Sequence, residues 1–170
     1  MRIVFIGAVK FSAEILQQLV EINADVVGVC TKEESVFNAD HVDLRSICEL
    51  NEIPWIYSDN INSAHALSWI RKLKPDVIFC FGWSEIIKDE LLGVPLLGVI
   101  GFHPTALPKN RGRHPLIWTL VLGLKETAST FFFMDSGADT GDIISQVEIQ
   151  IGHEDNANDP HAQFEFQPAR

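Results

Sequence analysis

The sequence predicts an α/β protein with a doubly wound, mainly parallel sheet and helices on both of its faces. Short runs rich in β-branched and aromatic residues alternate along the chain with segments whose apolar residues recur at helical spacing. One of these runs, DVIFCF at 76–81, is almost continuously apolar, as in a strand that is covered on both faces. Ligands of such sheets bind beyond the carboxyl ends of the strands, so functional residues are expected after Ile6, Phe81 and Phe102.

The boundaries of the elements follow from turn residues and from the apolar period. The first run ends at Gly7, and Phe11, Ile15 and Leu16 then share one helical face. Strands are expected at 2–6, 24–31, 54–57, 76–81, 97–102, 128–134 and 143–151, and helices at 11–20, 44–51, 64–73, 86–92 and 116–124. The final strand alternates apolar and polar residues, which is typical of a half-exposed strand.

One domain is expected over residues 1–151. A chain of 170 residues that is 46% hydrophobic is long enough to bury one core. Residues 152–170 lose the periodicity and are polar, so a disordered or truncated tail is expected there. The formal net charge of −10 disfavours RNA or DNA as a partner, because phosphate contacts need clustered Lys and Arg. A small-molecule substrate is the expected partner, and a homodimer is left open.

The N-terminus and the cysteines indicate the cellular setting. The opening MRIVFIGAV has no basic region or small-residue cleavage site, and no apolar stretch approaches the roughly 20 residues of a membrane span. We therefore expect a cytoplasmic protein with no membrane partner. Cys30, Cys48 and Cys80 form an odd set without CxxC spacing, so neither a disulfide framework nor a zinc site is expected, and each thiol is predicted to be buried.

The turn after the first strand, GAVKFS at 7–12, gives only a weak signal for a dinucleotide. That fingerprint needs three glycines as G-x-G-x-x-G, and this turn holds Gly7 alone. The expected role of Gly7 is to permit a tight strand-to-helix turn. A helix that begins near Phe11 and Ser12 could instead aim its positive end at an anionic group.

Two polar loops carry the residues that point to chemistry. Residues 101–115, GFHPTALPKNRGRHP, hold His103, and residues 135–142, DSGADTGD, hold Asp139. An imidazole and a carboxylate on neighbouring strand-end loops can form a pair in which the carboxylate orients the ring, and such a pair can stabilise an oxyanion or move a proton. The chain has no G-x-S-x-G elbow, so direct transfer to an external acceptor is favoured over a covalent enzyme intermediate.

The second loop raises the alternative of a divalent metal. Asp135, Asp139 and Asp142 are interspersed with glycines, as in calcium loops. The twelfth residue counted from Asp135 is Gln146, which cannot supply the closing bidentate carboxylate. No metal is therefore expected.

Together the two loops resemble formyltransferases that use 10-formyltetrahydrofolate. The family pattern is an N-x-H-P/A-S-L-L-P-x-x-R-G stretch followed further along the chain by D-x-G-x-D-x-G-x-I. The first stretch is matched by His103, Pro104, Leu107, Pro108, Arg111 and Gly112, and the second by Asp135, Gly137, Asp139, Gly141 and Ile143. The opening RIVFIGAVKFSAEIL also resembles the family's first strand and helix, so the resemblance covers about residues 1–150 and implies a Rossmann-like formyltransferase fold.

The resemblance implies a mechanism and a set of binding residues. An amine attacks the formyl carbon of the folate, protonated His103 stabilises the oxyanion, and Asp139 supports the imidazolium and assists proton removal from the amine. Folate would lie in a cleft between residues 81–86 and 135–142. The residues implied in folate binding are Phe81, Gly82, Trp83, Ile86, Asp135, Gly137, Ala138 and Asp142, and those implied in acceptor binding are Lys10, Pro104, Arg111, Gly112, Arg113 and His114.

One position departs from the family pattern. The Asn two positions before the His falls here on Gly101, which has no side chain to donate a hydrogen bond to the formyl oxygen. The loss of one such donor is worth roughly 3 kcal/mol of transition-state stabilisation, or about a hundredfold in rate. Asn110, Arg113 and His114 are candidate replacements, and a solvated loop is the alternative for these side chains. An impaired member that binds folate or a sugar nucleotide without turnover is therefore a second hypothesis.

The resemblance defines the reaction more closely than it defines the acceptor. Members that act on initiator methionyl-tRNA carry a further C-terminal domain and a basic surface, and glycinamide ribonucleotide enzymes carry a Gly/Ser-rich phosphate-binding turn, so both acceptors are disfavoured here. Members that formylate nucleotide-linked amino sugars, as in lipopolysaccharide biosynthesis, resemble this chain in FHP, RGRHP and the nearby Trp118. We therefore expect a nucleotide-linked amino sugar, with Lys10 as a candidate phosphate contact or else a solvated lysine. A hydrolase that uses water as the acceptor is a further alternative.

Overall fold

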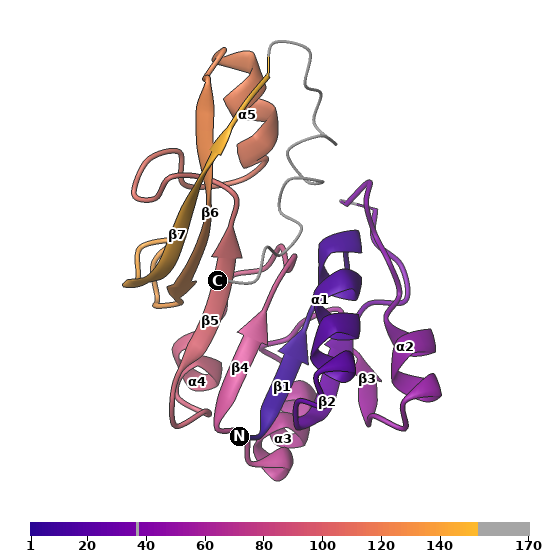
Figure 1. The fold of residues 1–170 in the computed structure, drawn as a ribbon. Helices are drawn as coiled ribbons and strands as arrows, with labels where there is room; N and C mark the ends of the chain where they lie inside the picture. The colour runs from indigo at the N-terminus through magenta and orange to yellow at the C-terminus, as the bar shows by residue number, and fades with distance from the viewer. Residues whose placement is uncertain (37, 153–170) are drawn as a thin grey trace. The chain divides into compact units, whose positions relative to one another are not determined.

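The structure, a computed structural model, describes residues 1–36 and 38–152, which divide into two compact units (Figure 1). The first unit consists of Met1–Gly101 and Met134–Ser136. The second consists of Phe102–Phe133 and the described residues from Gly137 onward. The predicted domain at 1–151 stays a prediction, and the predicted tail lies, apart from residue 152, outside the described residues.

The first unit is built on parallel strands. They are β1 (Ile3–Ile6), β2 (Val26–Thr31), β3 (Trp55–Tyr57), β4 (Val77–Cys80) and β5 (Val99–His103), and they lie in the order β3-β2-β1-β4-β5. The order reverses between β1 and β4, which is the switch point where ligands of doubly wound sheets bind. The predicted fold class is therefore confirmed, and each expected strand of this unit is present with ends that differ by one or two residues.

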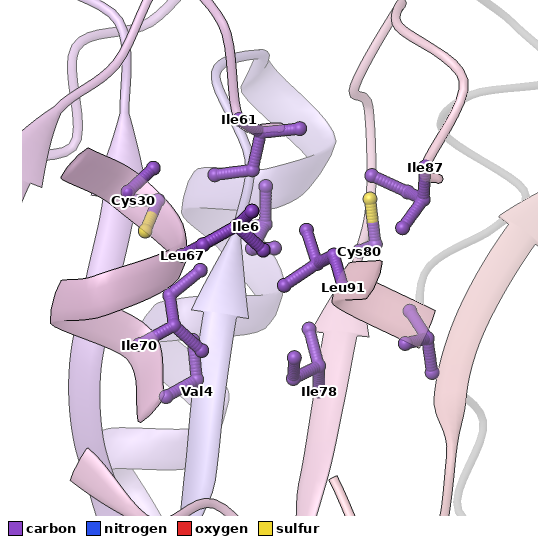
Figure 2. Close-up of a cluster of buried hydrophobic side chains, with 12 residues drawn as sticks. Val4, Ile6, Cys30, Ile61, Leu67, Ile70, Ile78, Cys80, Ile87 and Leu91 are labelled. Carbon is purple, nitrogen blue, oxygen red and sulfur yellow. The ribbon is translucent and has the colours of Figure 1, made fainter. Parts of the chain in front are cut away.

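The helices of the first unit cover both faces of its sheet. They are α1 (Lys10–Glu21), α2 (Arg45–Leu50), α3 (Ala64–Leu73) and α4 (Asp89–Leu92). Figure 2 shows one face, where Val4 of β1 and Ile78 of β4 meet Ile70 of α3 and Leu91 of α4 in a buried apolar cluster. On the other face, Phe11 of α1 packs against Phe81 with ring centroids 6.2 Å apart. Because successive strand residues point to opposite faces, both faces of β1 are apolar.

The ends of α3 illustrate how the sequence limits the helices. Ser63 precedes the helix, and its hydroxyl accepts a hydrogen bond from the backbone N–H of Ala66 at 3.2 Å. Lys74 ends the helix in the left-handed conformation, directly before Pro75. The helix expected at 86–92 is shorter than predicted, because regular hydrogen bonding begins only at Asp89.

The second unit contains α5 (Pro115–Val121) and the antiparallel strands β6 (Glu126–Phe133) and β7 (Ile143–Gln150). Thr127 and Thr130 of β6 donate hydrogen bonds to the carbonyl oxygens of Pro104 and Thr105, at 3.1 and 2.6 Å. These bonds fix the start of the loop that carries His103. The expectation of a half-exposed final strand is wrong, since Ile149 is the one buried residue of β7. The alternation of apolar and polar residues along β7 therefore does not correspond to one buried face and one exposed face.

No helix among the described residues is long and apolar enough to span a membrane. The prediction of a cytoplasmic location stays a prediction.

The three cysteines are buried, as predicted. Burial, which is the largest cause for each, raises the pKa of the Cys48 and Cys80 thiols to about 12 and also raises that of Cys30 above its ordinary value. Nearby negative groups add to the shift, Asp43 at Cys48 and Glu85 at Cys80. The thiols are therefore protonated and unreactive at neutral pH.

We expect a thiol reagent at pH 8 to label none of the cysteines in the folded chain and all of them after unfolding. The raised pKa values also set a pH dependence. For Cys48 and Cys80, the buried neutral thiol contributes fully to stability below the ordinary pKa of 9.0, and this contribution is lost as the pH rises towards about 12. Rapid native-state labelling at pH 8 would contradict the buried placement.

Candidate active site

His103 stands at the carboxyl end of β5 and is buried, with 6% of its surface exposed. Its Nδ1 lies 3.6 Å from Oδ2 of Asp139, and its Nε2 lies 3.1 Å from the backbone oxygen of Asn110. All three residues belong to the second unit. The two residues that the sequence singled out as a pair are thus adjacent.

The loop around Asp139 presents its carboxylate in a fixed orientation. Asp139 adopts the left-handed conformation with φ 54°, and its Oδ2 accepts a hydrogen bond from the backbone N–H of Gly112 at 3.0 Å. Gly137 is required by the turn, because a Cβ there would collide with Oγ1 of Thr140. Among the described residues no group of His, Cys, Asp or Glu is arranged to hold a metal ion.

The contacts of His103 define which atoms carry hydrogen. A backbone carbonyl can only accept, so Nε2 must be the donor to Asn110. A neutral ring with hydrogen on Nε2 would turn the lone pair of Nδ1 towards the Asp139 carboxylate. The other ring nitrogen, Nδ1, faces Oδ2 of Asp139 at 3.6 Å. An imidazolium would carry a hydrogen on each nitrogen, one directed at Asp139 and one at the oxygen of Asn110.

The segment after Asn110 borders a small hollow of about 260 Å³. It is lined by Asn110, Arg111, Arg113, Trp118 and Leu122. The guanidinium groups of Arg111 and Arg113 suit an anionic group, and the indole of Trp118, 54% exposed, offers a flat apolar face. Of the predicted acceptor-binding residues, these two arginines line the hollow, whereas Pro104, Gly112 and His114 do not. His114 instead begins α5 in the left-handed conformation.

The predicted folate residues fall in both units. Phe81, Gly82, Trp83, Ile86 and Asp135 belong to the first unit, and Gly137, Ala138 and Asp142 belong to the second. Gly7 and Gly82 are packed closely at the switch point. A Cβ on Gly7 would lie 2.6 Å from the Ser12 side chain, and Ser12 Oγ donates to the Phe81 oxygen at 2.6 Å. Gly7 therefore serves a tight turn, as the sequence predicts.

Backbone N–H groups at the start of α1 already have hydrogen-bond partners, so they are less available to an anion than the sequence predicts. The backbone N–H of Lys10 donates to the oxygen of Asp40 at 2.9 Å, and that of Val9 donates to Ser12 Oγ at 3.3 Å. The Lys10 side chain is 77% exposed and lies 3.8 Å from Glu14 in an i,i+4 pair. Its proposed contact with an acceptor phosphate stays a prediction.

An ion pair that was not predicted from the sequence supports Trp83. Lys32 Nζ lies 2.8 Å from Oε1 of Glu85 and 4.6 Å from the centre of the Trp83 ring. Oε2 of Glu85 also accepts from the backbone N–H of Ile61 at 3.3 Å. The signal was weak because a lone Lys after β2 and a lone Glu after β4 are far apart in the sequence.

We expect Lys32→Met to lower the free energy of unfolding by about 1–2 kcal/mol, because it removes a partly buried ion pair and a cation–π contact. Lys10→Met is the matched control, since Lys10 also pairs with a Glu but is exposed, and it should change stability by less than about 0.5 kcal/mol. Urea unfolding monitored by Trp fluorescence measures both. Equal effects of the two variants would contradict a structural role for Lys32.

Residues 1–168 match the family described as formyl transferase, and the chain belongs to this family. The resemblance predicted from the two motifs is confirmed.

Two curated relatives are similar to most of this chain. The chain is 35% identical to the methionyl-tRNA formyltransferase of Thermotoga maritima over 155 residues. This aligned region covers 89% of this chain and 50% of that protein. The chain is 34% identical over 165 residues to the methionyl-tRNA formyltransferase of Pelotomaculum thermopropionicum, with 95% and 53% covered. The chain thus spans about half the length of these curated relatives.

Solved structures share the fold. The phosphoribosylglycinamide formyltransferase from Bacillus halodurans has a TM-score of 0.82 and 20% identity, with 96% of this chain and 87% of that chain covered. A sugar 3N-formyl transferase, solved in the presence of dTDP and 5-N-formyl-THF, has a TM-score of 0.73 and 21% identity, with 96% and 57% covered. At these identities the likeness shows the fold alone.

Proposed function

We propose that this chain transfers a formyl group from 10-formyltetrahydrofolate to a primary amine. The observation that carries the proposal is the buried His103 within 3.6 Å of Asp139, in a member of the formyl transferase family. When bound, the folate supplies an electrophilic formyl carbon. The imidazolium of His103 donates a hydrogen bond to the formyl oxygen as charge develops there, and Asp139 holds the ring and balances its charge.

The residues after β4 fit a flat heterocycle with polar edges. Ile86 is 64% exposed, so an apolar side chain is open to a ligand. The indole N–H of Trp83 is buried and has no hydrogen-bond partner among the described residues, which marks it as an unsatisfied donor beside this segment. These features support the proposed folate contacts at Phe81, Gly82, Trp83 and Ile86.

We propose a nucleotide-linked amino sugar as the acceptor. The support is chemical: Arg111 and Arg113 beside Trp118 combine cationic groups with an aromatic face, which suits a nucleoside diphosphate. The net charge of −10 disfavours a large polyanion. A second candidate is methionyl-tRNA, because the two relatives at 34–35% identity act on that substrate by name.

An acceptor panel tests these alternatives. The 170-residue chain is incubated with 10-formyltetrahydrofolate and, separately, nucleotide-linked 3-amino and 4-amino sugars, glycinamide ribonucleotide and methionyl-tRNA. Formyl product is identified by mass spectrometry. Product with an amino sugar alone supports the proposal, and product with methionyl-tRNA alone replaces it with the second candidate. Folate binding with no product from any acceptor would indicate an impaired binding domain.

A further inference from the structure

One short segment of the second unit forms hydrogen bonds with both members of the His103–Asp139 pair. The backbone oxygen of Asn110 accepts from Nε2 of His103 at 3.1 Å. The backbone N–H of Gly112, two residues later, donates to Oδ2 of Asp139 at 3.0 Å. The segment 110–112 therefore holds the pair through its backbone.

This arrangement conflicts with the proposed chemistry. Nδ1 of His103 faces Asp139, so Nε2 is the ring nitrogen that remains for a substrate oxygen. Its hydrogen is already donated to Asn110, and a single N–H cannot give a strong linear bond to two acceptors at once. For His103 to act on the formyl oxygen, the contact with Asn110 must break.

The same segment lines the hollow beside Trp118. Asn110 and Arg111 contribute to its wall together with Arg113. A ligand that fills the hollow therefore contacts the residue whose carbonyl restrains His103. Asn110 is therefore shared by the hollow and by the contact that occupies Nε2.

The backbone of the segment has two residues with positive φ. Asn110 and Gly112 have φ of 55° and 99°, in the region that favours glycine. A Cβ on Gly112 would meet no atom within 4 Å, so a side chain there disturbs only the backbone conformation. The observed arrangement thus depends on the freedom of Gly112 and can be weakened without a steric clash.

We propose that segment 110–112 is a latch that holds His103 until the acceptor binds. The anionic, nucleotide-bearing part of the acceptor binds Arg111 and Arg113 in the hollow, draws Asn110 away and frees Nε2. Asn110 is thus a positioning residue that acts through His103. The inference rests on the proposed function for the identity of the acceptor, whereas the latch contacts are present in the chain itself.

Titration with dTDP as the probe tests the latch. The chain holds six histidines, so it is labelled with ¹⁵N-histidine and the His103 signals are assigned from their loss in His103→Gln. We expect the Nε2 resonance of His103 to shift on saturation with dTDP, and to show the same shift without ligand in Gly112→Ala. Gly123→Ala is the matched control, because Gly123 also has a positive φ, of 62°, and open space around it.

The affinity for dTDP distinguishes release of a latch from a general disruption of the loop by the substitution. If the closed form of segment 110–112 cannot bind dTDP, a substitution that weakens the closed form raises the fraction of molecules able to bind. Gly112→Ala should therefore bind dTDP several-fold more tightly than the parent chain. Gly123→Ala should bind as the parent does. Calorimetry measures the dissociation constants, and thermal unfolding shows that both variants fold.

Two results would overturn the latch. One is an Nε2 resonance that does not move at saturating dTDP or in Gly112→Ala, and the other is an absence of dTDP binding. Formyl transfer is measured separately. A shifted Nε2 resonance in a chain that formylates no amino sugar would preserve the latch and refute the proposed acceptor.

Discussion

His103→Gln is expected to lower kcat for formyl transfer by about 10²–10⁴-fold with little change in the KM for folate. Gln can still donate a hydrogen bond, but it carries no positive charge and cannot pair with Asp139 at 3.6 Å as an imidazolium does. The lost interaction is made mainly as charge develops on the formyl oxygen, so the effect falls on kcat. Steady-state rates on the acceptor identified by the panel measure it.

His65→Gln is the control for this substitution, because His65 lies exposed on α3 and outside every proposed contact. It should leave kcat unchanged. Thermal unfolding of both variants checks that His103→Gln is folded. A His103→Gln variant that is folded and retains more than about a tenth of the parent kcat would exclude His103 as the donor.

The parallel sheet could be predicted because its signals are local. Apolar runs such as DVIFCF at 76–81 and the breaks at Pro54 and Pro75 are read directly from the sequence, and the strands of the first unit appear close to those positions. The burial of β7 could not be predicted in the same way. Alternation along 143–151 shows that two faces differ, but only tertiary packing decides whether either of them is covered.

The His103–Asp139 pair could be predicted because both members are side chains in recognisable motifs. The contacts that restrain the pair could not, since Asn110 and Gly112 act through a backbone carbonyl and a backbone N–H that every non-proline residue possesses. The two partners of Lys32, Glu85 and Trp83, were likewise hidden by their distance along the chain. The sequence motifs therefore predict the candidate catalytic side chains, and the structure adds the backbone and side-chain contacts around them.

The net charge of the chain is negative, whereas the proposed acceptor site is lined by two positively charged residues. The chain carries a formal net charge of −10, yet Arg111 and Arg113 line the same hollow. A long polyanion such as tRNA interacts with the whole surface, whereas a nucleoside diphosphate interacts with a few groups at short range. This contrast is why the proposal favours a small anionic acceptor although the relatives at 34–35% identity are methionyl-tRNA enzymes by name.

Gly101→Asn is expected to raise kcat by about a hundredfold, or roughly 3 kcal/mol of transition-state stabilisation. Gly101 is buried in β5, where it pairs with Cys80, two residues before His103. An Asn at this position would restore the side-chain amide of the family pattern and give the formyl oxygen a second donor beside His103. Single-turnover rates at saturating folate and acceptor measure the chemical step directly.

Gly101→Ala separates the amide from the mere presence of a side chain, because it adds the same Cβ without a donor. It should leave the rate at or below that of the parent chain, and thermal unfolding reports what the added atoms cost the buried strand. If Gly101→Asn folds and is no faster than Gly101→Ala, the chain does not lack a donor at this position. A backbone or side-chain group of the His103 loop would then already supply the second hydrogen bond, and the rate of the parent chain would be that of a complete site.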